Sequence, residues 1–406
     1  MMNLRPLNLT PKEQTKVVDT AKEAYADFYR LLTLVAVFVS FGLIMLYSTS
    51  FGIKGAYYFK MQLCWVTIGA SAGLFLFILG YQRVLKTALF FLVTCFILLI
   101  IARFCYPPIK GAYRWIKLPF CNLQPSEFCK LAVAFFVAKY CSENMRTLSC
   151  FFHKKGIIPL AIGLGMGCGG IILGKDFGTT LLVGVVACST LFIAGIKLRY
   201  ALVPLVCLAL GVLYIVCKDA ERLSRMVTFL NPEVVAKEEG YQLFNSLMAL
   251  GSGSWWGIGF TASRMKAKYL PEAHTDFIVA IVGEELGFVV IILIIIFYGL
   301  FFYLGYKIAS YSKTKAGTFL AFALTLGIYL QSCINLLVVS GAAPTKGMPA
   351  PFLSYGGSNM VASLMAVGII CSVAYDEVEP GYSDNVINWI FNKIAFLGRI
   401  FSKQSH

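Results

Sequence analysis

Charge is the property that this sequence has least of. Only 14% of its 406 residues are charged, whereas 58% are hydrophobic, and the mean hydropathy is +0.75. These values exclude a soluble protein. Apolar segments recur along the chain, each long enough as a helix to cross about 30 Å of hydrocarbon. The composition therefore predicts an all-α polytopic membrane protein.

Other absences narrow the class further. The chain has no internal repeat of fixed period, no low-complexity tract and no complete set of metal ligands. Its 13 cysteines lie mostly within apolar runs, which argues against a disulfide framework, although Cys105 and Cys121 share one loop and their pairing stays open. The net charge of +15 fits loops that face anionic headgroups or a phosphorylated lipid better than nucleic acid.

The apolar runs predict ten membrane spans: 31–47, 61–79, 84–102, 125–140, 157–173, 179–194, 201–217, 278–304, 319–339 and 354–374. With the N-terminus inside, inner segments carry nineteen basic residues and short outer loops carry eight. The positive-inside rule therefore predicts cytoplasmic termini. The large loop 218–277 then lies outside.

The two terminal segments are polar. Residues 1–30 are too acidic for the start of a signal peptide, so we expect a cytoplasmic N-terminal segment that is not cleaved. Residues 31–375 form the predicted membrane domain, and residues 376–406 a cytoplasmic tail. Within the tail, 386–396 is weakly amphipathic, which suits either the inner leaflet or a frayed helix.

The acidic stretch before the eighth span is the candidate reaction centre. Glu272, His274 and Asp276 occupy alternate positions, so in an extended segment their side chains would point the same way. Glu284 and Glu285 fall about 12 Å deeper if the run is helical, a depth at which ionisable groups are costly and usually functional. Asp276 has an equally good alternative as the helix N-cap.

Two further outer loops carry unusual polar residues. Arg114 beside Trp115 suits a phosphate headgroup, although an interfacial tryptophan with an extended arginine is the simpler interpretation. Glu127 is expected to pair with Lys130 one turn later, and Asp176 to cap the sixth span. These last two assignments are structural.

Cations gather in the remaining outer loops. Arg264, Lys266 and Lys268 follow the glycine-rich stretch 251–259, a combination able to hold an anionic headgroup. Loop 341–358, rich in glycine and proline, requires irregular backbone at membrane depth, which is tolerated only where protein or a polar cavity covers it. We expect it to form the far wall of such a cavity, with Lys346 projecting into it.

Together these segments resemble the SEDS family (shape, elongation, division and sporulation), whose members include FtsW and RodA. The matching motifs span residues 30–375: Leu46–Ser50, Arg114–Ile116, Gln124–Glu127, Asp176–Thr179, Gly240–Gln242, Leu270–Ile278, Gly283–Gly287 and Pro351–Ser358. The segments Pro344–Gly347 and Glu272–Asp276 are more similar to the division-type FtsW branch. Departures occur at Lys175, 254–256, Ala350 and Asn359, and affect loop geometry rather than the acidic core.

The resemblance implies a peptidoglycan glycosyltransferase that polymerises lipid II on the outer face of the bacterial cytoplasmic (inner) membrane. Asp276 matches the family's essential aspartate and would be the general base. The implied substrate-binding residues are Arg114, Trp115, Lys346, Glu272, His274, Arg264, Lys268 and Ser354, with Glu127, Asp176, Glu284 and Glu285 in supporting roles. A divalent cation (Mg or Mn) is left open. The implied partners are a class B penicillin-binding protein, other divisome proteins and membrane lipids.

Two alternatives of a different class remain at this point. A lipid II flippase would need a polar path through the bundle, whereas the ionisable residues concentrate at the outer side. A non-catalytic scaffold that recruits a transpeptidase would tolerate loss of Asp276. Channels and small-solute transporters fit the composition but not the motifs.

Overall fold

The structure is a computed structural model. It describes residues 11–109, 111–119, 121–148, 156–218, 240–268, 270 and 273–388. Its elements are α1 (Pro11–Lys54), α2 (Tyr57–Leu79), α3 (Tyr81–Lys86), α4 (Ala88–Cys105), β1 (Ile116–Lys117), β2 (Asn122–Leu123), α5 (Pro125–Asn144), α6 (Ile157–Leu173), α7 (Phe177–Ile193), α8 (Leu198–Lys218), α10 (Tyr241–Gly253), α11 (Met265–Lys268), α12 (Ile278–Leu286), α13 (Phe288–Tyr311), α14 (Lys315–Val339) and α15 (Gly357–Val378). The fold is almost entirely helical, as predicted.

Each predicted span overlaps a helix, and the bounds of α6 are those predicted. Among the residues that the structure describes, six helices are long and apolar enough to cross a membrane: α1 over Thr20–Ser50, α2, α4, α13, α14 and α15. Helices α6, α7 and the Leu202–Ile215 part of α8 are apolar but shorter. The chain is therefore a multi-pass membrane protein with six candidate spans by these criteria.

The expectation of one continuous helix over 278–304 is wrong. Gly287 has φ 82° and separates α12 from α13, in the left-handed region that glycine adopts without strain. A Cβ on Gly287 would lie 2.3 Å from the Trp255 carbonyl oxygen, so the close approach of a second loop also requires glycine. Glu284 and Glu285 therefore end a short helix instead of lying inside a long one.

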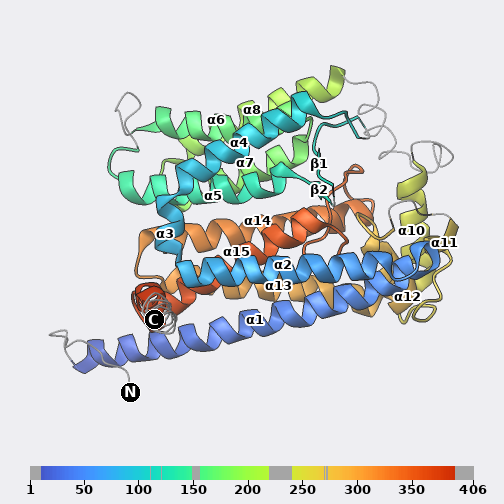
Figure 1. The fold of residues 1–406 in the computed structure, drawn as a ribbon, viewed down its shortest axis with the longest axis horizontal. Coiled ribbons are helices and arrows are strands. Elements are labelled where there is room, and N and C mark those ends of the chain that lie inside the picture. The colour runs from blue at the N-terminus through green and yellow to red at the C-terminus, as the bar shows by residue number, and fades with distance from the viewer. Residues whose placement is uncertain are drawn as a thin grey trace, which may run out of the picture.

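The helices form two groups that meet at α5 and α14. Figure 1 shows α4 to α8 on one side and α1, α2 and α13 to α15 on the other. Helix α14 packs against both α5 and α7 across the boundary, and α15 packs along α2. In that last pair, a Cβ on Gly368 would lie 2.2 Å from the Gly73 carbonyl oxygen, so small residues allow the backbones to touch.

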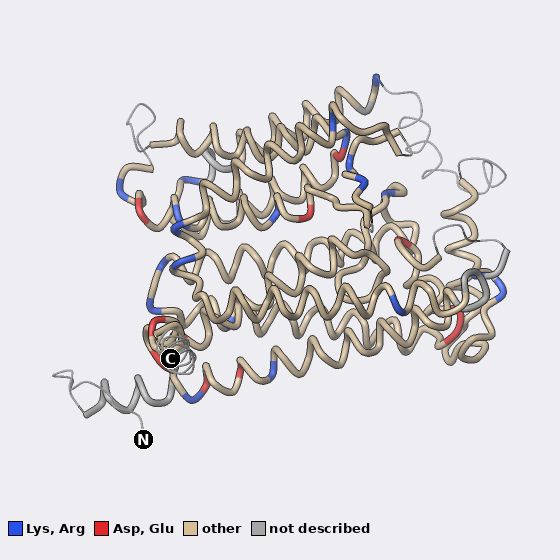
Figure 2. The backbone as a smooth tube through the Cα atoms, viewed as in Figure 1, with Lys and Arg blue, Asp and Glu red and all other residues tan. Residues whose placement is uncertain are grey.

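The irregular segments gather at one end of the bundle. In Figure 1 the β1–β2 hairpin and helices α10 to α12 lie at the end opposite α3. Figure 2 shows most Lys, Arg, Asp and Glu residues near the two ends, with the middle of the bundle mainly uncharged. This arrangement places the loops predicted to face outward beside one another.

Candidate active site

Asp276 lies in a turn rather than in an extended segment. Residues 273–277 form turns, so the extended segment expected for His274 and Asp276 is wrong. Glu272 falls outside the described residues. Helix α12 begins at Ile278 with Phe277 as its N-cap. Asp276 precedes the N-cap by one residue, so the cap position considered from the sequence belongs to its neighbour.

The turn is fastened to α14 and to the loop between α14 and α15. Asn335 Nδ2 donates to the Asp276 carbonyl oxygen at 2.8 Å and to the Met348 carbonyl oxygen at 2.7 Å. A Cβ on Gly347 would lie 2.8 Å from Asp276 Oδ2. The half-buried carboxylate of Asp276 therefore rests against the bare Cα of Gly347, where any larger residue would crowd it.

Beside this loop, two cations surround one buried carboxylate. Asp176 is the N-cap residue of α7 and is 2% exposed, and its Oδ2 accepts from the Thr179 hydroxyl at 2.9 Å. Arg114 Nη2 lies 3.6 Å from Asp176 Oδ1. The Lys346 ammonium occupies the space above Gly178, where a Cβ would lie 0.7 Å from Nζ. The sequence predicted neither of these contacts between distant loops.

Burial and charge act on this cluster in opposite directions. Burial alone would raise the pKa of Asp176, but Arg114 and Lys346 together lower that pKa below its usual value. Burial lowers the pKa of Lys346 to about 8, and the Arg114 charge adds to the effect, against the opposing attraction of Asp176. The cluster thus holds two cations against one carboxylate in a partly desolvated place.

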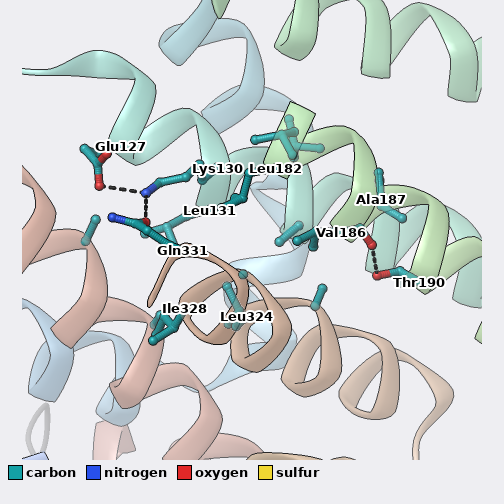
Figure 3. Close-up of a pocket in the computed structure, with 18 of the residues that line it drawn as sticks. Glu127, Lys130, Leu131, Leu182, Val186, Ala187, Thr190, Leu324, Ile328 and Gln331 are labelled. Carbon is teal, nitrogen blue, oxygen red and sulfur yellow. Dashed lines mark hydrogen bonds and ion pairs between the residues drawn. The ribbon is translucent and has the colours of Figure 1, made fainter. Parts of the chain in front are cut away.

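A buried polar chain connects the same loop to α5. Glu127 accepts from Lys130 Nζ and from Asn359 Nδ2, both at 2.8 Å, so the expected Glu127–Lys130 pair is present. Lys130 also donates to Gln331 Oε1 at 2.5 Å, and Gln331 Nε2 donates to the Pro349 carbonyl oxygen at 2.9 Å. Figure 3 shows this chain at one side of a cavity.

Sequence reasoning missed Gln331 and Asn335. Both are buried on α14, one helical turn apart, inside an apolar run. Two carboxamides at that spacing in a predicted span are a signal that could have found them, because buried polar groups in a membrane need partners.

A cavity lies between α5, α7, α14 and α15. Its lining is apolar apart from Glu127, Lys130, Gln331, Thr190 and Ser363. Figure 3 places Glu127, Lys130 and Gln331 together at one side and Thr190 at the other. A mostly apolar lining with a group of polar side chains at one side is chemically suited to the hydrocarbon chain of a lipid.

The two acidic residues of α12 are bound to the segment 263–266 rather than to the loop between α14 and α15. Glu284 and Glu285 are each 1% exposed. Glu284 accepts from the Ser263 hydroxyl and, at 3.0 Å, from the Arg264 backbone N–H. Glu285 pairs with Lys266 Nζ at 2.6 Å. These bonds hold the cationic segment against α12, and Lys266 is committed to an internal ion pair.

The remaining predicted residues occupy varied positions. The His274 ring lies 4.4 Å from the Tyr58 ring. Trp115 is half-buried and Arg264 is exposed, and the Lys268 side chain falls outside the described residues. Ser354 is buried and its hydroxyl accepts from the Ala350 N–H at 2.8 Å, which gives it an internal role in the loop. Cys105 and Cys121 are free thiols.

Within the described ranges, no cluster of three or more His, Cys, Asp and Glu side chains is placed to hold a metal ion. We therefore assign no residues to the divalent cation that the resemblance left open.

Fold and site together define a polytopic helical membrane protein whose polar loops converge at one end of the bundle. The family model for FtsW, RodA and SpoVE, described as a cell cycle protein, matches residues 29–379. This chain belongs to that family.

Named relatives and solved structures agree with this assignment. A probable peptidoglycan glycosyltransferase FtsW of Trichlorobacter lovleyi is 37% identical, covering 85% of this chain and 92% of the relative. Stage V sporulation protein E of Bacillus subtilis is 34% identical, and the match covers 87% of this chain and 98% of that protein. One solved structure comes from a study of the structural coordination of polymerization and crosslinking by a peptidoglycan synthase complex. A chain of that structure superposes on this protein with TM-score 0.73 at 25% identity, and the match covers 86% of this chain and 98% of that one. Thermus thermophilus RodA shares the fold, with TM-score 0.65, 23% identity and coverage of 86% and 97%.

Proposed function

We propose that this protein is a peptidoglycan glycosyltransferase that polymerises lipid II at the outer face of the bacterial cytoplasmic membrane. The observation that carries the proposal is that the loop between α14 and α15 contacts Asp276 through Gly347 and reaches the Arg114–Asp176 pair at the start of α7 through Lys346. Family membership and the printed names of the relatives supply the reaction class.

In the proposed step, Asp276 accepts the proton of the acceptor's sugar hydroxyl as that oxygen attacks the donor's anomeric carbon. A new C–O bond forms, and the bond from the anomeric carbon to undecaprenyl pyrophosphate breaks. A carboxylate can act this way when it lies within hydrogen-bond reach of the hydroxyl. Asp276 is only partly buried beside Gly347, which leaves part of the residue open to a substrate.

Arg114 and Lys346 would bind the pyrophosphate and stabilise its charge as it leaves. With a pKa of about 8, Lys346 is about nine-tenths protonated at pH 7. Arg114 Nε is buried and finds no hydrogen-bond acceptor among the described residues, so this guanidinium has a donor to spare for an incoming anion.

The cavity between α5, α7, α14 and α15 would hold part of the isoprenoid chain, with Glu127, Lys130 and Gln331 at its polar side. The proposed topology has ten spans and cytoplasmic termini. It is supported by a helix at each predicted span and by the gathering of the irregular loops at one end.

A class B penicillin-binding protein is the proposed partner, since the synthase complex of the solved neighbour is described as coordinating polymerization and crosslinking. The proposed role in division follows the FtsW relatives. Other divisome proteins would bind around the same assembly.

The test is glycan-strand formation from purified lipid II by the full chain, alone and with its class B penicillin-binding protein in which the transpeptidase serine is replaced. Polymer that requires the chain supports the proposal. Absence of polymer with every partner tried, together with lipid II translocation in vesicles, would support the flippase instead; absence of both activities would support the scaffold.

A further inference from the structure

A short loop presents four apolar side chains outward. In residues 254–260, which we call the tryptophan loop, Trp256 is 82% exposed and Trp255 60% exposed, and Ile258 and Phe260 are also exposed. Exposed large apolar residues grouped in one loop mark an interaction surface. This loop departs from the glycine-rich pattern that the resemblance led us to expect.

The loop is held firmly to the junction of α12 and α13. The N–H groups of Ile258 and Gly259 donate to the carbonyl oxygens of Glu284 and Glu285 at 3.0 and 3.1 Å. In return, the first N–H groups of α13 donate to carbonyl oxygens of the loop, Phe288 to Ser254 at 2.9 Å and Val289 to Trp255 at 3.3 Å. Backbone bonding on both sides fixes the position of the backbone from which the two indoles project.

Side chains reinforce this attachment. Glu284 binds Ser263 and the Arg264 N–H, and Glu285 binds Lys266 and, at 2.6 Å, the Ser48 hydroxyl of α1. The loop is therefore joined to α1, α12 and α13 together. Its aromatic side chains are outward because the backbone places them there.

The position of the loop identifies what faces it. Val289 and Phe288 form the first turn of α13, a helix long and apolar enough to span a membrane. The half-exposed Phe288 ring lies edge-on to Trp255 at 5.5 Å. Further along α13, Ile292, Leu293, Ile295 and Ile296 are exposed, and in a membrane protein such a surface faces hydrocarbon. Phe288 belongs to that surface at the start of α13, and Trp255 of the loop packs against Phe288.

We propose that the tryptophan loop inserts into the headgroup–acyl boundary of the membrane and anchors the α12–α13 junction to the lipid surface. Indole rings favour that boundary because they have an apolar body and one N–H donor. The exposed Arg264 beside the loop suits anionic headgroups. The proposal rests on exposure and geometry and does not depend on the glycosyltransferase reaction.

The test uses the full chain labelled with 5-fluorotryptophan in nanodiscs of phosphatidylethanolamine and phosphatidylglycerol. The fluorine signals of Trp255 and Trp256 are assigned from single Trp→Phe variants, and their broadening is compared for 5-doxyl lipid and an aqueous gadolinium chelate. Trp115, which is half-buried and directly precedes β1, is the internal reference. We expect both loop signals to broaden more with the lipid label than with the chelate.

Stronger broadening by the chelate would place the loop in water and overturn the proposal. The proposal would also be overturned if neither label broadened the loop signals and the signals shifted when the single-span transpeptidase was added, because the loop would then contact protein. Since the labelled native chain is measured, failure of a variant to fold cannot produce either result.

Discussion

Two acid–base clusters lie at the same end of this protein, and they differ in how completely their charges are satisfied. Around α12, Lys266 pairs with the buried carboxylate of Glu285, and the buried carboxylate of Glu284 accepts from the Ser263 hydroxyl and the Arg264 N–H. At the head of α7, two cations, Arg114 and Lys346, share the single carboxylate of Asp176, with Arg114 at 3.6 Å. We call the first cluster closed, because its carboxylates already have short-range partners. We call the second cluster open, because it has one more positive charge than negative charge.

This difference separates structural from functional charges more clearly than motif position does. A buried ion pair with short bonds is already satisfied and can gain little from a ligand. A desolvated cluster with excess positive charge is unfavourable until an anion arrives. We therefore assign the α12 cluster to loop anchoring and the Arg114–Asp176–Lys346 cluster to binding.

The largest effect is expected in the closed cluster. Lys266→Met should lower stability by about 3–5 kcal/mol, because it leaves a buried carboxylate without its partner. The thermal midpoint of the protein in detergent measures this loss. Arg83→Met is the matched control, since Arg83 pairs with the exposed carboxylate of Asp384. Equal thermal midpoints for the two variants would contradict the claim that the Lys266–Glu285 pair stabilises the fold.

In the open cluster the loss should appear in activity. Lys346→Ala should reduce lipid II polymerisation by about 10²–10³-fold, the usual cost of removing one group that stabilises developing charge. Its thermal midpoint should change little, because the substitution removes a desolvated cation. A large fall in midpoint with unchanged specific activity would reverse the assignment of the two clusters.

Gly178 tests whether the position of the Lys346 ammonium matters. Gly178→Ala places a methyl group where Nζ now lies, so the flexible lysine end must move while the backbone stays. Displacing a binding group by about 1 Å can cost up to about 10²-fold in rate, less than losing the charge outright. Gly169→Ala on α6, whose Cβ would meet nothing within 4 Å, is the control, and equal activity in both variants would exclude a positioning role.

The smallest effect is a dependence on pH. With its pKa at about 8, Lys346 is about nine-tenths charged at pH 7 and about one-tenth charged at pH 9. Since the cation binds the anion, kcat/KM for lipid II should fall about tenfold across that range. Lys346→Arg keeps its charge, so its profile should lack this fall; a native profile that is flat to pH 9 would argue against Lys346 as the binding cation.

The sequence predicted most of the helices because apolar runs long enough for a membrane have few alternatives to helix. It could not locate the break at Gly287, because glycine inside an apolar run is common and only the approach of Trp255 makes it necessary here. It also expected an extended segment where residues 273–277 turn.

The sequence pointed to the individual residues of the candidate site, but not to which of them contact one another. Asp276, Arg114, Asp176 and Lys346 were all selected from their loops. However, the seating of Lys346 on Gly178 and the bond from Asn335 to the Asp276 turn join segments far apart in the chain. Lys266 could not be separated from Arg264 and Lys268 by spacing alone, because only its contact with Glu285 reveals that it is already paired.

The most direct test of the central claim compares lipid II polymerisation by the native chain and by Asp276→Asn, each bound to the transpeptidase partner. Asp384→Asn, an exposed position paired with Arg83, controls for the loss of one carboxylate. Because a general base contributes about 10²–10⁴-fold, a folded Asp276→Asn protein should make almost no polymer while Asp384→Asn matches the native chain. Equal polymer from the native chain and Asp276→Asn would contradict the account.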